Sequence, residues 1–227
     1  MTKEVKPYWT IFLLSLSTLS FEIILARIFS YVLAYHFVLI IIAFAILALA
    51  LGQLYASRLA AKNSLSYSNY FIILQLLFPL SLAAIFILPS VESIGSGSVG
   101  LILYILLASV TFFLVGIITA SIFQSNGDKI RTLYALDLIG AAGGSLLGLF
   151  LLNTFSIVQS LAIILIVFSV ASFLSLPLIK RKGFILTTAS VVLVSLYLIL
   201  LTPYVEIDIA KSSEKDLMRL KSNPSVK

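Results

Sequence analysis

The sequence has no cysteine and only one histidine among its 227 residues. The first absence excludes disulfides, thiolate metal sites and cysteine nucleophiles, and the second excludes a multi-histidine metal or haem site within this chain. Charge is also scarce: only 11% of the residues are Asp, Glu, Lys or Arg, whereas soluble domains have about a quarter. No metal site and no cofactor is expected from this composition.

Apolar residues are abundant instead. They make up 61% of the chain, and the mean hydropathy is +1.16. This balance excludes both a soluble globular domain and a disordered chain. The apolar runs exceed about 18 residues and lack a two-residue period, which favours membrane-spanning helices over a β-barrel. We therefore expect an all-α fold, a polytopic membrane protein with a bundle of about seven transmembrane helices, and the lipid bilayer as its partner.

The expected transmembrane domain covers residues 1–203, and residues 204–227 form a soluble charged tail with four acids and five bases. The tail is too short to fold alone, and it has the character of a linker to a further domain. The predicted spans are residues 9–33, 37–56, 70–88, 101–123, 133–152, 157–179 and 184–201.

The net charge of +6 is distributed beside the predicted spans, so it does not indicate a nucleic-acid partner. Nine bases lie on the side of the N-terminus, and the short loops of the other side have none. The positive-inside rule then places the N-terminus in the cytoplasm of a cell-membrane protein and, by parity, the tail outside. If one apolar run were re-entrant and did not span the membrane, the tail would lie on the cytoplasmic side. The nine bases are Lys3, Lys6, Arg58, Lys62, Lys129, Arg131, Lys180, Arg181 and Lys182.

Three ionisable residues fall inside predicted spans: Glu22 and Arg27 in the first and Asp137 in the fifth. Each costs ~2.5–3.5 kcal/mol in hydrocarbon unless it has a partner, a polar cavity or a route to the interface. Counted from Trp9, Glu22 lies ~20 Å deep, whereas Asp137 lies only ~6 Å from the cytoplasmic surface. A direct contact between the two carboxylates is therefore not expected. Arg27 can extend to the far surface, and Arg58 is the expected partner of Asp137.

These charges have two interpretations. They are structural ion pairs or interface anchors that fix helix register, or they form a polar site for a substrate, proton or cation between helices. Ser15 and Thr18 precede Glu22 by seven and four residues, so the three share one helix face. Such a polar stripe can line a cavity or serve interhelical hydrogen bonding.

The fifth span has the sharpest local motif, because Gly140, Gly144 and Gly148 recur every four residues. Glycine at this spacing leaves one helix face without side chains, so another backbone can approach closely. Asp137 lies on the same face. The pattern predicts tight packing within the chain or a dimer interface, and a Gly144→Leu change should disrupt it more than Gly143→Leu. A phosphate-binding glycine loop is excluded, because no strand precedes the run and no lysine follows it.

Three segments together resemble the N-terminal membrane region of the membrane-integrated spermidine synthase-like proteins, in the polyamine aminopropyltransferase superfamily. They are LSTLSFEIILARIFSYVL, ALALGQLYASRLA and LYALDLIGAAGGSLLGLFLL. The matching residues are Glu22 and Arg27 in the first, Gly52 and Arg58 in the second, and Asp137, Gly140, Gly144 and Gly148 in the third.

In that family a soluble Rossmann-like domain follows the helices and transfers an aminopropyl group from decarboxylated S-adenosylmethionine to an amine. The residues of this chain contain neither the glycine-rich turn nor the acidic amine site of such a domain. We therefore expect no catalytic residue here and no aminopropyltransferase activity from this polypeptide alone. The sequence is expected to be a truncated membrane region or a stand-alone relative.

Three functional hypotheses follow. The chain is the membrane module of a spermidine synthase-like protein, which anchors a catalytic domain or handles a polyamine-like cation. The candidate intramembrane polar site comprises Glu22, Arg27, Arg58 and Asp137, and its two carboxylates suit a protonated amine. Alternatively, the chain is a small transporter or channel, or a structural subunit whose glycine face docks other membrane subunits.

Overall fold

The structure is a computed structural model that describes residues 6–32, 35–60, 67–87, 98–175 and 189. The regular structure of these residues is entirely helical, with six α-helices and one 3-10 turn. The elements are α1 (Lys6–Val32), α2 (Tyr35–Ala60), α3 (Tyr67–Ile87), α5 (Ser98–Ser125), η2 (Gly127–Lys129), α6 (Ile130–Thr154) and α7 (Ile157–Ser175). The first six predicted spans are confirmed as helices over their described residues. Residues 33, 88 and 176–179 of these spans lie outside the described residues.

The expected count of about seven spans differs from what the structure gives. Among the described residues five helices are long and apolar enough to cross a membrane, namely α1, α2, α5, α6 and α7. The apolar part of α3 extends only over Asn69–Ile85, which at 1.5 Å per residue is ~25 Å, short of a hydrocarbon core of ~30 Å. The predicted seventh span, residues 184–201, lies outside the described residues except for residue 189. The five apolar helices indicate a lipid bilayer environment.

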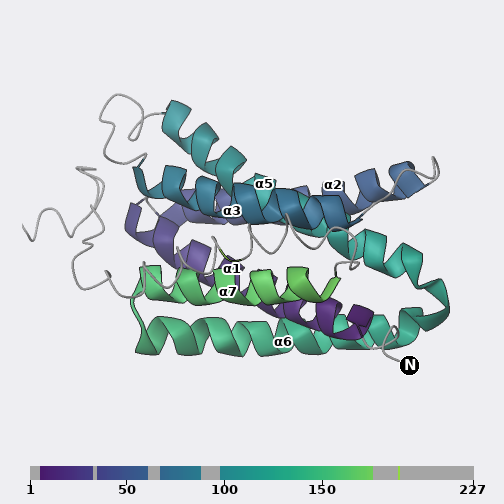
Figure 1. Cartoon of the computed structure of the whole chain (residues 1–227). Helices are drawn as coiled ribbons and strands as arrows, with labels where there is room; N and C mark the ends of the chain where they lie inside the picture. Colours follow the sequence, from purple (N-terminus) through teal and green to yellow (C-terminus); the bar gives the residue numbers. More distant parts are fainter. Residues whose placement is uncertain (1–5, 33–34, 61–66, 88–97, 176–188, 190–227) are drawn as a thin grey trace, which may run out of the picture.

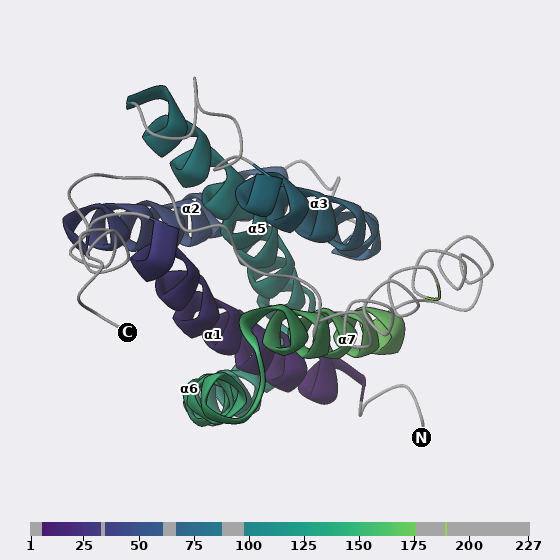
Figure 2. The same ribbon diagram turned by 90° about the vertical axis from the view of Figure 1, so that its left-hand side faces the viewer.

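The helices form two layers (Figures 1 and 2). In one layer α2 and α3 pack on α5, and in the other α6 and α7 pack on α1. Successive helices alternate in direction, so α1, α3 and α6 run one way and α2, α5 and α7 the other (Figure 1). The most extensive pairings are α2 with α5 and α1 with α6, which are parallel neighbours from distant parts of the chain.

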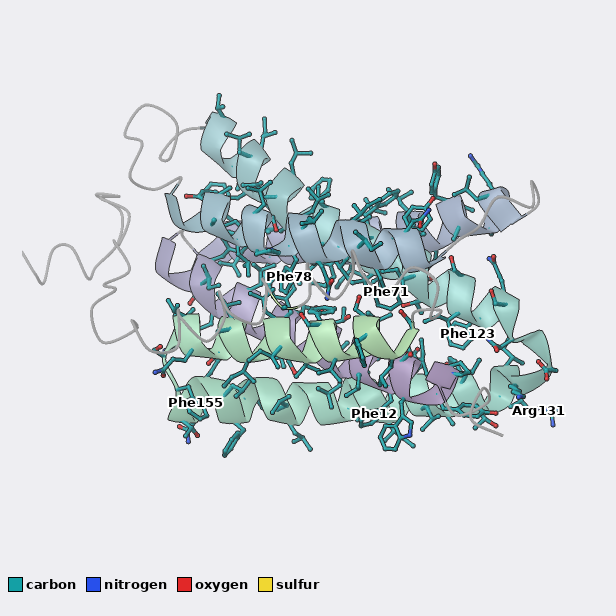
Figure 3. The ribbon with its side chains drawn as sticks, viewed as in Figure 1. Phe12, Phe71, Phe78, Phe123, Arg131 and Phe155 are labelled. Carbon is teal, nitrogen blue, oxygen red and sulfur yellow. The ribbon has the colours of Figure 1, made fainter. Side chains whose placement is uncertain are left out.

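Aromatic rings fill the region where the two layers meet. Phe21 of α1 contacts Phe78 of α3 with ring centroids 4.6 Å apart, and it stacks on Phe112 of α5 at 5.5 Å. Phe78 in turn contacts Phe168 of α7 at 5.0 Å. All four side chains are buried, and Figure 3 shows Phe78 at the boundary between the layers. Edge-to-face and stacked pairs of this kind supply van der Waals attraction, on which helix association in lipid depends.

Candidate functional site

The three spaced glycines of α6 are buried and lie against the backbone of α1. A Cβ atom at Gly140 would stand 2.5 Å from a carbonyl oxygen of α1, and one at Gly144 would stand 2.9 Å from a Cα atom. At Gly148 the nearest Cα atom would be 3.2 Å away. Only glycine permits this approach. The opposing residues of α1 are, in order, Phe12, Leu16 and Ser20.

The close approach lets short side chains bridge the two helices. The Ser15 hydroxyl of α1 donates a hydrogen bond to the Asp137 carboxylate of α6. One turn further along, the Ser20 hydroxyl lies 2.7 Å from the carbonyl oxygen of Gly144 and donates to it. A serine hydroxyl is only one carbon from its backbone, so neither bond could form if side chains separated the helices. The glycines of α6 therefore permit the close approach, and the serines of α1 form hydrogen bonds across it.

Arg58, the partner expected for Asp137, is not the one that the structure provides. Within the described residues Asp137 bonds to Ser15, and no ion pair joins it to Arg58. The reason lies in how the helices pair: Asp137 is on α6, which packs on α1, whereas Arg58 is exposed in the last turn of α2, which packs on α5.

Glu22 is half-buried on α1, seven residues beyond Ser15, or ~10 Å along the axis. In the part of the chain that the structure describes, its carboxylate makes no hydrogen bond or ion pair, and it does not contact Asp137. Thr18 lies between Ser15 and Glu22 on α1 and is buried. Its hydroxyl donates to the Leu14 carbonyl oxygen at 2.6 Å, so the Thr18 hydroxyl oxygen can still accept a hydrogen bond. Arg27, further toward the end of α1, is exposed.

Ser15, Thr18 and Glu22 thus follow one face of α1, and Asp137 of α6 joins them through its hydrogen bond with Ser15. We name these four residues the polar line. It begins at the contact with α6 and continues about two turns along α1. Its groups are carboxylates and hydroxyls, which accept hydrogen bonds from cationic donors. Among the described residues, no group of three or more His, Cys, Asp or Glu side chains could hold a metal ion.

A second close contact, between α2 and α5, was not predicted. A Cβ atom at Gly52 would stand 3.0 Å from the Phe113 carbonyl carbon, and one at Gly116 would stand 3.0 Å from the Leu49 carbonyl carbon. In the sequence, Gly52 supports only the family resemblance, and no pattern predicts a role for Gly116. The signal was present in α2, where small residues recur every three or four positions and are buried: Ala45, Ala48, Gly52 and Ala56.

Comparison of the chain with protein-family models, with curated proteins and with solved structures finds no match. The resemblance to the spermidine synthase-like membrane region therefore stays a prediction from three short segments.

Proposed function

We propose that this chain is a membrane module of the spermidine synthase-like type that binds a polyamine-like organic cation along the polar line. In this role it would hold the cation for a catalytic domain that it anchors in the membrane. The observation that carries the proposal is the Ser15–Asp137 hydrogen bond between α1 and α6, with the carboxylate of Glu22 following on the same face of α1.

The two carboxylates suit a linear polyamine better than a single metal ion. Glu22 lies ~10 Å along α1 from Ser15, the residue that bonds to Asp137, so one small ion cannot contact both carboxylates. A flexible chain with an ammonium group near each end can do so, and the hydroxyl oxygens of Ser15 and Thr18 lie between. Carboxylates also offset the desolvation of an ammonium group, which is otherwise costly in a low-dielectric site.

The centre of the bundle favours a binding module over a channel. The rings of Phe21, Phe78, Phe112 and Phe168 occupy the region between the two layers, where a central pore would need polar lining. The polar line instead begins at the contact between α1 and α6, where Ser15 bonds to Asp137. A cation would thus be held beside one pair of helices.

The proposal predicts that spermidine stabilises the purified chain. In detergent, spermidine at about 100 times its Kd should raise the melting temperature by roughly 5–10 °C, relative to NaCl at equal ionic strength. Asp137→Asn and Glu22→Gln should each abolish most of this shift, because each removes one carboxylate with little change of shape. The measurement is a thermal melt over a spermidine titration.

The matched control is Asp128→Asn, which removes an exposed acid in η2 and leaves the polar line intact. This variant should retain the full shift. If NaCl reproduced the shift, or if Asp128→Asn abolished it equally, the effect would come from overall charge and the proposed site would be wrong. If only Asp137→Asn lost the shift, the ligand would be a small cation at one carboxylate.

We also propose that the N-terminus and η2 face the cytoplasm, as the distribution of bases indicates. Arg131 and Phe155 lie at opposite ends of α6 (Figure 3), so the two ends can be tested separately. Since the chain has no cysteine, single cysteines at Asp128 and Ser156 give no background. An impermeant thiol reagent should label the Ser156 cysteine in intact cells and the Asp128 cysteine only after permeabilisation. The reverse pattern would invert the orientation.

A further inference from the structure

A shallow hollow lies where α5 turns into α6. It is lined by Phe123 of α5 and by Ile130, Arg131 and Tyr134 of α6. Figure 3 shows Phe123 and Arg131 at the same end of the molecule, on the two sides of this turn. The surface of the hollow is apolar, formed by two rings, one aliphatic side chain and the stem of the arginine. Ile130 and Tyr134 are exposed, at 50% and 58%.

The polar groups beside the hollow favour an anion. The guanidinium of Arg131, an exposed residue, is planar and forked, a geometry that matches two oxygens of a phosphate. In addition, α6 begins at Ile130 after Lys129, and no side chain caps its first turn. The first N–H groups of a helix and the positive end of its dipole attract negative charge. Asp128 is the one acid of η2, and the two bases of this turn, Lys129 and Arg131, exceed it in charge.

The hollow also lies at the depth of lipid headgroups. The apolar segment that includes α6 extends over Gly127–Thr154, so Arg131 and Tyr134 occupy its first two turns, where a bilayer changes from headgroup to hydrocarbon. Arginine and tyrosine are both suited to this interface. A ligand here would have a phosphate at the level of Arg131 and an apolar part beside Ile130 and Tyr134.

We propose that this hollow binds one anionic phospholipid. Its phosphate is held by Arg131 in the first turn of α6, and the upper part of an acyl chain packs on Phe123, Ile130 and Tyr134. The apolar lining is what selects a lipid over free phosphate, because phosphate alone would leave that surface unfilled. The site is separate from the polar line, and either proposal can hold without the other.

The test is lipid binding to the purified full chain, measured by native mass spectrometry in detergent. Phosphatidylglycerol should bind more tightly than phosphatidylcholine, and Arg131→Gln should weaken phosphatidylglycerol roughly 10-fold, which is the effect of losing one charge-assisted contact. Arg58→Gln is the matched control, because Arg58 is an exposed cation at the end of α2 and does not line the hollow. This variant should bind phosphatidylglycerol like the parent chain.

Two further arms separate lipid from other anions. Ile130→Ser changes an exposed residue and keeps every charge, and it should also weaken phosphatidylglycerol. Inorganic phosphate should not displace the lipid any more than NaCl does at the same ionic strength. Equal loss in Arg58→Gln, no loss in Ile130→Ser, or ready displacement by phosphate would each overturn the proposal.

Discussion

Replacing Gly144 with alanine is expected to lower the melting temperature of the purified chain by roughly 3–10 °C, whereas Gly143→Ala should leave it unchanged or raise it slightly. The two residues are neighbours in α6, and the substitution is the same. They differ in what the added methyl group would meet. At Gly144 it would stand 2.9 Å from both the Cα and the carbonyl carbon of Leu16, atoms of a helix backbone that cannot rotate aside.

At Gly143 the same methyl group would meet only the Leu16 Cδ1 atom, at 3.7 Å, an ordinary van der Waals contact. Alanine is also a better helix former than glycine, by about 1 kcal/mol. Gly143→Ala therefore shows how the substitution changes the melting temperature when the added methyl group does not clash. The measurement is a thermal melt of both variants in the same detergent. Equal losses, or a larger loss at Gly143, would show that the face of α6 toward α1 has been assigned wrongly.

The clash that alanine introduces at Gly144 should also weaken cation binding at the polar line. Separating α1 from α6 would lengthen the Ser20 hydrogen bond to the Gly144 carbonyl oxygen and the Ser15 hydrogen bond to Asp137. The second loss would leave a carboxylate without its partner inside the membrane. We therefore expect Gly144→Ala to reduce the spermidine shift as well, whereas Gly143→Ala should not.

The sequence predicts one side of the contact between α1 and α6, namely the face of α6. The four-residue spacing of Gly140, Gly144 and Gly148 identified the face that packs closely and placed Asp137 on it. It could not identify the partner, because a face without side chains accepts any helix backbone. Depth could have helped: Ser15 lies six residues past Trp9, ~9 Å deep, close to the ~6 Å estimated for Asp137. The same arithmetic that separated Glu22 from Asp137 would have paired Ser15 with it.

The positions of the helices were predictable for a different reason. In a bilayer every backbone group must be satisfied within its own helix, so long apolar runs determine where helices lie. Nothing in that argument fixes which helices are neighbours. The pairs α1–α6 and α2–α5 join distant segments, and their contacts depend on single glycines. The sequence predicts Arg58 as the partner of Asp137 because both are expected at the cytoplasmic end, but their helices pack in different layers.

The contact between α2 and α5 should show that Gly52 and Gly116 act as one unit. Gly52→Ala and Gly116→Ala are each expected to lower the melting temperature by roughly 3–10 °C, because each methyl group would meet backbone atoms at 3.0–3.2 Å or closer. The double variant should lose clearly less than the sum of the two. Either methyl group alone pushes α2 away from α5, and the second then enters space that the first has already opened.

Gly127→Ala is the control for the glycine-to-alanine change itself, because a Cβ atom there would meet nothing within 4 Å. It should leave the melting temperature close to that of the parent chain, and its effect should add to that of Gly52→Ala. Additive losses for Gly52 and Gly116 would mean that each methyl group is accommodated separately, and that the two glycines do not share a contact. Sub-additive losses confined to that pair would establish that the two helices meet at these residues, since substitutions without a shared partner normally add.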